Sequence, residues 1–396
     1  YQIKLRDLFK NQSKTWEWFS SVKVKEEQLQ EFKTSLLKNA YRLEKEVNTD
    51  LYDKLSLVKE KLALDIDITL YQAQNSIENN AQISYLPGQA HLVFSGQIMK
   101  LMTGDELVSV IAHELSHVRL FSIENAEFEV ADRIITSIAN DNRSSDVFVE
   151  TARLFRLYME LYCDRVSLLV TGNIDTVLSG LIKLNTGLDQ VSVVSYLKQV
   201  DEIFNIENSK SEDQTHPENY IRVKALNLWH TEKELSEPFI NKMLEGDLDM
   251  DSLDVFKQAE LKDLSFELIK IILKPKWIRT TAVMSLSHQY QNDFTPSNDV
   301  EITEKLVNAV QAVTKSVKEY LSYILLDFAL VDPSLEDMPM GFAFQIAENL
   351  GLKDTFNDAV KKELKLGHRK LIELQNRATK SLAEIKESKQ EHIYNE

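Results

Sequence analysis

The sequence predicts an α+β protein that is mostly α-helical and has one small sheet in its first half. Three observations support this class. Apolar residues recur at helical spacing along most of the 396 residues. Apolar and polar residues alternate with a period of two, as in β-strands, in parts of the segment between residues 65 and 94. The chain has 10 Gly and 7 Pro, too few for the many turns of an all-β protein.

The first 63 residues predict a helical segment that packs on the domain after it. From Lys25 to about Leu64, apolar residues at helical spacing predict two amphipathic helices. The period then changes, because apolar and polar residues alternate from Asp65 to Leu70, and two β-like runs follow, Ile83 to Leu86 and Ala90 to Phe94. We therefore expect a small antiparallel or mixed sheet of three strands.

Two longer helices are expected after this sheet. Thr103 to Glu106 has the S/T-x-x-E form of a capping box, and the apolar stripe behind it predicts a helix from about Gly104 to about Phe121. A second helical pattern extends from Asp146 to about Val170 and meets a stop at Gly172. The two helices should pack against each other in the core.

The rest of the chain also predicts helices. We assign residues 64–232 to the main domain, residues 233–299 to a helical connector and residues 300–396 to a C-terminal all-helical domain. The polar run from Asn208 to Gln214 predicts a loop, and the acidic stretch around Glu245 to Asp254 indicates a domain boundary.

Length, charge and cysteine content bound the class of protein. The chain has 46 basic and 62 acidic residues and a formal net charge of −16, so its surface repels phosphate backbones and anionic lipids. We expect no nucleic-acid partner, and no membrane span, because no apolar run reaches about 18 residues. The single cysteine fits a reducing compartment, which favours the cytoplasm. A periplasmic location stays open, because the sequence begins at Tyr1 and a leader could have been trimmed.

The main chemical signal is the segment His113-Glu114-Leu115-Ser116-His117, an H-E-x-x-H motif inside a predicted helix. A spacing of four places both imidazoles on one helix face, where their nitrogens can bind one zinc ion. Glu114 is displaced around the helix and can reach a water on the metal without being a ligand. The alternative is a chance match without a metal, in which case the motif has no chemical meaning.

A catalytic zinc site needs a third protein ligand and one open position. Glu160 is the candidate, because an unpaired carboxylate among leucines would be costly to bury. Asp164 lies four residues further on the same face and predicts an acceptor that fixes the tautomer of a zinc-bound histidine. The alternative is that both carboxylates pair with neighbouring arginines on a solvated face.

Three motifs in this order resemble one peptidase family. Glu160-x-x-x-Asp164 follows the H-E-x-x-H motif, and Thr215-His216-Pro217 with Arg222 comes after it. Over about residues 60–232 this pattern resembles the HtpX and CAAX prenyl endopeptidase family of gluzincins, the M forty-eight peptidases. Cys163 stands where the family usually has a small residue. Many members also carry transmembrane helices, which this sequence lacks.

The resemblance implies a gluzincin-type metallopeptidase domain and the composition of its site. It implies one zinc ion per chain, held by His113, His117 and Glu160. It further implies a catalytic Glu114, with Asp164 supporting the ligands from behind. His216 and Arg222 are implied to support the substrate or the oxyanion.

The remaining candidate residues are given structural interpretations. Cys163 lies on a predicted helix without a paired base, so we interpret it as a residue packed behind Asp164 and not as a nucleophile. Five histidines have no partner at ligand spacing and are interpreted as core or surface residues: His91, His230, His288, His368 and His392.

The expected activity is hydrolysis of peptide bonds in protein substrates. Zinc lowers the pKa of its bound water toward about 7, and Glu114 takes the proton and later returns it to the leaving amine. We expect the substrate to bind as an extended strand along Ala90 to Gly96. Two alternatives stay open. One is a zinc-binding scaffold or latent protease that acts through protein contacts; the other is a helical interaction protein with an accidental motif.

The C-terminal region is faintly similar to the TerB-like helical modules of tellurite resistance. The similarity lies in Asp327 to Asp332 and in Phe342 to Glu348. Such modules carry an acidic loop, but Pro333 and Glu336 depart from its spacing, so we assign no metal there. We expect this domain to bind a regulatory protein partner.

Overall fold

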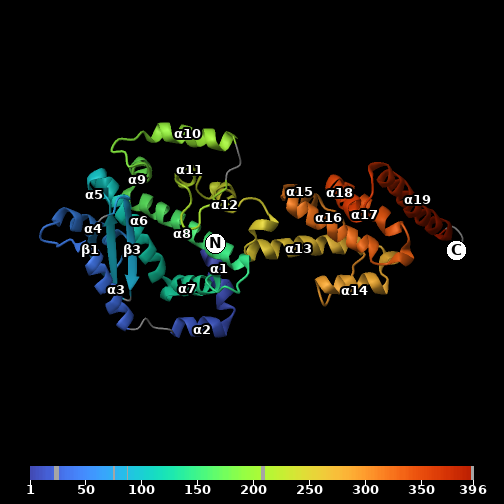
Figure 1. Ribbon diagram of the computed structural model, residues 1–396, viewed down its shortest axis with the longest axis horizontal. Coiled ribbons are helices and arrows are strands. Elements are labelled where there is room, and N and C mark those ends of the chain that lie inside the picture. The colour runs from blue at the N-terminus through green and yellow to red at the C-terminus, as the bar shows by residue number, and fades with distance from the viewer. Residues whose placement is uncertain (22–25, 75, 87, 207–209, 394–396) are drawn as a thin grey trace. The chain divides into compact units, whose positions relative to one another are not determined.

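The computed structural model describes residues 1–21, 26–74, 76–86, 88–206 and 210–393. The chain divides into two compact units, Tyr1–Gly246 and Asp247–Glu396 (Figure 1). This division falls within the acidic stretch that indicated a boundary. Residues 233–246 belong to the first unit and residues 247–299 to the second, so the segment expected as a connector is shared between the units.

The first unit contains a mixed sheet. Within the described residues it has four strands, in the order β1–β2–β4–β3. β2 (Asp67–Ala73) and β4 (Gln89–Ser95) are parallel. β1 (Ala40–Arg42) is antiparallel to β2, and β3 (Asn80–Leu86) is antiparallel to β4. Strand β4 is therefore interior, and β3 forms an edge of the sheet.

The structure has the two helices expected between Lys25, which lies outside the described residues, and Leu64, but a strand separates them, and the expected place of the substrate strand is wrong. Helix α3 (Glu26–Asn39) ends and β1 follows at once, because Ala40 is buried and pairs with Ala73 on β2. The substrate strand was expected along Ala90 to Gly96, but β4 has a strand on both sides and offers no free edge there.

The two faces of the sheet are covered differently. On one face, Leu92 and Phe94 of β4 are fully buried in a core shared with α4 (Thr49–Lys61) and α6 (Gly104–Ser122). On the opposite face His91 is buried, with its ring centroid 5.7 Å from that of Phe32 on α3. His91, interpreted as a core or surface residue, thus lies in the interior.

Helix α6 begins at the predicted capping box. The Thr103 hydroxyl accepts from the Glu106 N–H, and the Glu106 carboxylate accepts from the Thr103 N–H. Glu106 also accepts from Ser179 and from the Lys183 ammonium at 2.8 Å, both on α9 (Ile174–Thr186). The start of α6 is therefore joined to α9 by a buried ion pair.

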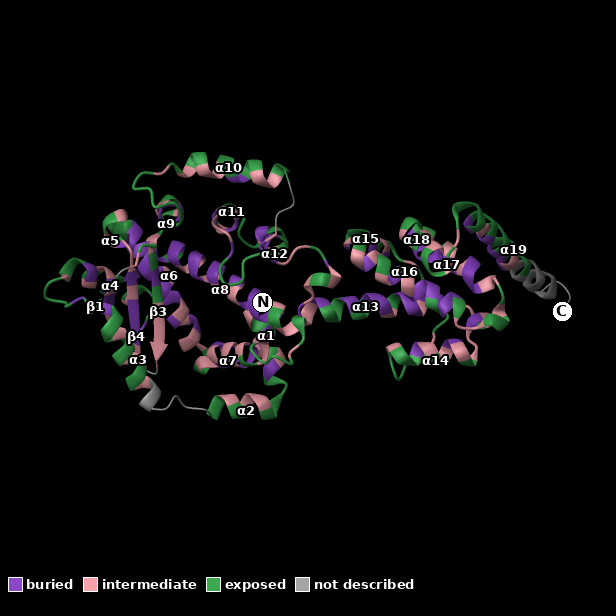
Figure 2. Ribbon diagram, in the orientation of Figure 1, coloured by how far each residue is buried: buried purple, intermediate pink, exposed green. Residues whose placement is uncertain are grey.

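Helix α8 (Asp146–Thr171) ends where the sequence indicated, at Gly172 with φ +69°. Glycine adopts this left-handed conformation without a Cβ clash. α6 and α8 pack against each other, and Figure 2 shows both largely buried, whereas α10 (Val193–Ile206) is mostly exposed. The other helices of this unit are α1 (Gln2–Lys10), α2 (Ser13–Ser21), α5 (Ile98–Leu101), α7 (Glu127–Ala139), α10 (Val193–Ile206), α11 (Asn219–Glu232) and α12 (Glu237–Glu245).

The second unit is helical throughout its described regular elements and has its own hydrophobic core, which includes Leu321, Phe328 and Phe356. No helix in the described part of the chain is long and apolar enough to cross a bilayer. The helices of this unit are α13 (Val255–Ile272), α14 (Thr281–Tyr290), α15 (Glu304–Ala312), α16 (Lys315–Leu330), α17 (Met338–Asn349), α18 (Lys353–Glu363) and α19 (His368–Ile393).

Candidate metal centre

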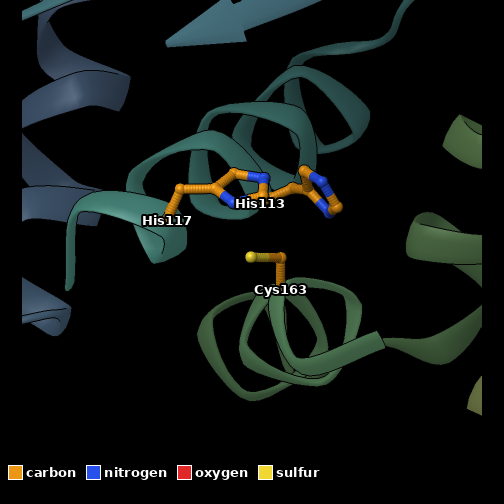
Figure 3. Close-up of side chains that lie close together, drawn as sticks. All are labelled: His113, His117 and Cys163. Carbon is orange, nitrogen blue, oxygen red and sulfur yellow. The ribbon is translucent and has the colours of Figure 1, made fainter. Parts of the chain in front are cut away.

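His113 and His117 lie one turn apart on α6 and face α8. Their ring centroids are 5.3 Å apart, and the two rings are nearly perpendicular, at 75° (Figure 3). The side chains are 13% and 18% exposed, so both imidazoles reach a surface that solvent can enter. The spacing in the motif therefore gives the shared helix face that the sequence predicted.

The Glu160 carboxylate of α8 lies against both imidazoles. Its Oε2 is 3.2 Å from His113 Nε2, and its Oε1 is 3.5 Å from His117 Nε2. Oε2 is buried and meets no donor in hydrogen-bond geometry. Burial opposes the charge on Glu160, but His113 and Arg222 outweigh it and lower its pKa to about 2. An anionic oxygen thus lies buried without a hydrogen bond.

These atoms fit a zinc ion. Tetrahedral zinc with bonds of about 2.0–2.1 Å to nitrogen and oxygen separates its ligand atoms by about 3.3 Å. The separations of 3.2 and 3.5 Å agree with this value. Two imidazoles with one carboxylate are also a common donor set of catalytic zinc. His113, His117 and Glu160 would hold the ion.

Asp164 and Arg222 fix the orientation of His113. Asp164 Oδ1 is 2.9 Å from His113 Nδ1, so an Nδ1–H donates to the carboxylate and leaves Nε2 free to bind a metal. Arg222 of α11 donates through Nε at 2.9 Å and Nη2 at 2.7 Å to the same carboxylate. Although burial disfavours the charged form, Arg222 and His113 hold the pKa of Asp164 well below its ordinary value. The main contact of Arg222 is thus with Asp164.

Glu114 lies beside the histidines, and its environment alters its proton affinity. The residue is 8% exposed, and burial is the main cause that raises the pKa of its carboxyl to about 7. The backbone of Ile83, on edge strand β3, opposes part of this rise in the pKa. A carboxyl group with a pKa near 7 can both accept and return a proton at neutral pH.

His216 lies on the open side of the site, in the segment before α11. Its side chain is 58% exposed, and its Nε2 is 3.7 Å from Glu160 Oε1. The structure therefore brings together every residue that the sequence proposed for the site, including His216 from a distant loop.

Cys163 is a neighbour of the histidines that the sequence interpretation missed. Its Sγ lies within 4.8 Å of a ring nitrogen of His113 and of His117, and Figure 3 shows the side chain rising from α8 toward the rings. Cys163 follows Glu160 by three residues. This helical spacing could have indicated that the two side chains share one face of α8. Burial and nearby carboxylates raise the pKa of the thiol well above its ordinary value, which disfavours the thiolate that binds zinc.

A cavity of about 500 Å³ opens over the site. His113, Glu114, His117 and His216 are among its lining residues, and residues 80–83 of β3 form one side. The apolar side chains of Val177, Leu181 and Leu184, on α9, form another. The candidate ligands and the candidate base therefore share one space with an edge strand and an apolar wall.

The choice between carboxylate and thiol as third ligand can be tested by metal analysis. We expect Glu160→Gln to reduce zinc content from about one per chain to a small fraction, because it removes the anionic ligand. Cys163→Ser should keep zinc near the level of the unaltered protein. The reverse pattern, with zinc lost in the serine variant and kept in the glutamine variant, would assign the thiol as the ligand.

The pair between Asp164 and Arg222 predicts a stability effect. Arg222→Met leaves a buried carboxylate without its main partner, so we expect a loss of about 3–5 kcal/mol in the free energy of unfolding. Arg165→Met is the control, since Arg165 and its partner Glu237 are 23% and 36% exposed. It should cost about 1 kcal/mol or less in denaturant titrations. Equal losses in the two variants would contradict the assignment.

Comparison with known proteins agrees with this geometry. Residues 42–230 match Peptidase family M48. The chain is also 25% identical over 199 residues to the plastoglobule-localized metallopeptidase 48, chloroplastic, of Arabidopsis thaliana, over 46% of this chain and 57% of that protein. The chain thus spans little more than half of that relative, and no solved structure matches it. The similarity of the C-terminal region to TerB-like modules stays a prediction. The segment from residue 42 to residue 230 is therefore similar to peptidase family M48, a family of zinc metallopeptidases.

Proposed function

We propose that this chain is a zinc-dependent endopeptidase that hydrolyses peptide bonds of protein substrates. One observation carries the proposal: the buried Glu160 carboxylate meets both H-E-x-x-H imidazoles and keeps an oxygen without a hydrogen bond. Arg222 Nη2 lies 3.8 Å from the same oxygen, beyond hydrogen-bond distance, so a bound cation would compensate this buried carboxylate more fully. The match to a metallopeptidase family supports the same conclusion.

Each side chain of the site then has a role. His113, His117 and Glu160 hold the ion, which when bound acts as a Lewis acid toward water and the substrate carbonyl. Glu114 accepts a proton from the attacking water and returns it to the leaving amine. His216, on the open side, donates a hydrogen bond to the oxygen that gains negative charge in the transition state.

The edge strand β3 is the place where we propose that the substrate backbone binds. β3 pairs with β4 on one side, and residues 80–83 line the cavity. An extended peptide can add to such an edge through main-chain hydrogen bonds. Ile83 and Glu114 line the same cavity, so this edge lies next to the proposed base.

The wall formed by α9 supports a preference for apolar substrate side chains. Val177, Leu181 and Leu184 are spaced by four and three residues, so they share one helix face toward the cavity. Two nearby lining hydroxyls have acceptors, since Ser109 donates to the Glu106 carbonyl and Ser167 to the Ser109 carbonyl, each at 2.8 Å. An aliphatic or aromatic side chain next to the scissile bond would fit this wall.

Two further expectations from the sequence stay predictions. The C-terminal helical unit is proposed to bind a regulatory protein, and the cytoplasm is the proposed location. A zinc-binding scaffold without turnover would have the same metal site. A test of the proposed general base therefore distinguishes such a scaffold from an active enzyme.

The role of Glu114 can be tested with Glu114→Gln, which keeps the shape of the side chain and removes its basicity. We expect cleavage of an unfolded protein to fall by at least about 100-fold, because the glutamine amide cannot accept the proton. Zinc content, measured on the same preparation, should be unchanged. Undiminished cleavage by the glutamine variant would exclude Glu114 as the base, and absence of cleavage by the unaltered chain would favour the scaffold.

The apolar wall makes a prediction about cleavage sites. Leu184→Arg should reduce cleavage next to aliphatic or aromatic residues by roughly tenfold, since it replaces an apolar surface with a charge. Leu188→Arg is the control, because Leu188 is 56% exposed and lies just beyond α9. Mass spectrometry of the peptides from an unfolded protein measures the bias. An unchanged bias in the Leu184 variant would remove α9 from the substrate site.

A further inference from the structure

Arg153 is a buried arginine on α8 that the proposed mechanism does not use. It is 6% exposed. Its guanidinium forms a fork with Glu150, from Nε to Oε2 and from Nη2 to Oε1, both at 2.7 Å. A buried arginine is costly unless its N–H donors are satisfied. The remaining nitrogen, Nη1, therefore also needs acceptors.

The third nitrogen of Arg153 binds the loop that carries His216. Nη1 donates to the backbone carbonyl of Ser211 at 3.2 Å and to that of Asp213 at 3.1 Å. The Ser211 N–H also donates to the Met243 carbonyl, which joins the start of the loop to α12. The guanidinium therefore connects α8 directly to the main chain of this loop.

Hydrogen bonds within the loop connect this contact to His216. Asp213 Oδ1 accepts from the N–H of Thr215 at 3.0 Å and from that of His216 at 3.5 Å. The Thr215 hydroxyl lies 2.9 Å from His216 Nδ1. From the other end, Glu218 accepts from the N–H of Asp213 at 3.2 Å. A short chain of hydrogen bonds thus leads from Arg153 to the imidazole.

Arg153 and Glu160 are seven residues apart on the same helix, and this spacing places them on one face two turns apart. His216 Nε2 lies 3.7 Å from Glu160 Oε1. One rigid helix therefore holds both the anchor of the His216 loop and the carboxylate beside His216. Because the His216 side chain is 58% exposed, packing contributes little to its position. The position depends mainly on the hydrogen bonds of its loop.

We propose that Arg153 is a positioning residue, which holds the exposed His216 imidazole at the site through the loop of residues 211–218. The inference rests on the proposed peptidase function for its kinetic consequence, but the placement of the loop does not depend on turnover. Lysine cannot replace this arginine, because an ammonium does not form the planar fork and bind two carbonyls at once.

A double-mutant cycle tests the proposal by comparing Arg153→Lys, His216→Ala and the double variant on one peptide substrate. Arg153→Lys should lower kcat by about tenfold with little change in KM, since the affected hydrogen bond forms in the transition state. In the His216→Ala background the same change should cost less than about twofold. Zinc content should stay constant in all variants. If the kcat losses of the two single variants multiply in the double variant, the two residues act independently and the proposal is overturned.

Arg165→Lys is the matched control for this cycle. This variant has the same substitution on the same helix. Arg165 pairs with Glu237, which lies outside the His216 loop. It should leave kcat within about twofold in both backgrounds. Should Arg153→Lys fail to fold, Asp213→Ala breaks the same chain of hydrogen bonds at the exposed loop. It should show the same non-additivity with His216→Ala.

A second measurement separates this inference from the proposed function. In NMR spectra of the zinc-loaded, histidine-labelled protein, Arg153→Lys should shift or broaden the His216 ring signals. Those of His91, buried behind the sheet, should stay in place. Inactivity of the unaltered chain would refute the peptidase proposal and leave this readout valid. Unchanged His216 signals would refute the positioning role whether or not the chain is active.

Discussion

Two carboxylates on one turn of α8, Glu160 and Asp164, are buried against the imidazoles of α6, and each must be compensated. A buried carboxylate without partners costs several kcal/mol. Asp164 is compensated by fixed donors, two from Arg222 and one from His113. Glu160 faces ring nitrogens and keeps one oxygen without a hydrogen bond. This difference gives the two carboxylates different chemistry, since Asp164 orients a histidine and Glu160 remains available to a cation.

This arrangement requires that α6, α8 and α9 lie close together. Small residues make the approach possible: the Ser167 hydroxyl of α8 donates to the Ser109 carbonyl of α6 at 2.8 Å. On α9, a Cβ at Gly180 would lie 3.2 Å from the Ser109 hydroxyl, so even alanine would require a shift of a few tenths of an ångström. The buried pair of Glu106 and Lys183 holds the same two helices together near the start of α6. The packing that positions the ligands therefore also positions the apolar wall of the cavity.

The sequence predicted best those features that depend on neighbours along the chain. The capping box at Thr103, the glycine after α8 and the histidine spacing are local, and each depends on helix geometry alone. Strand β1 could not be found, because Ala40 continues a helical stripe and its strand character comes from pairing with Ala73. The contact of Arg153 with the Ser211 carbonyl joins residues 58 positions apart and leaves no pattern in the sequence. The family motifs predicted which residues meet, whereas backbone contacts decide how they are held.

The position of the substrate edge follows from topology. β3 and β4 form an antiparallel pair, and the parallel pairing with β2 occupies the other side of β4. The strand just before α6 in the sequence, β4, is therefore enclosed, and the preceding strand, β3, becomes the edge. Because α6 packs against β3, this edge lies beside the H-E-x-x-H turn, and Ile83 and Glu114 line the same cavity. The same pairing that removes β4 as a docking strand thus places a free edge next to Glu114, the proposed base.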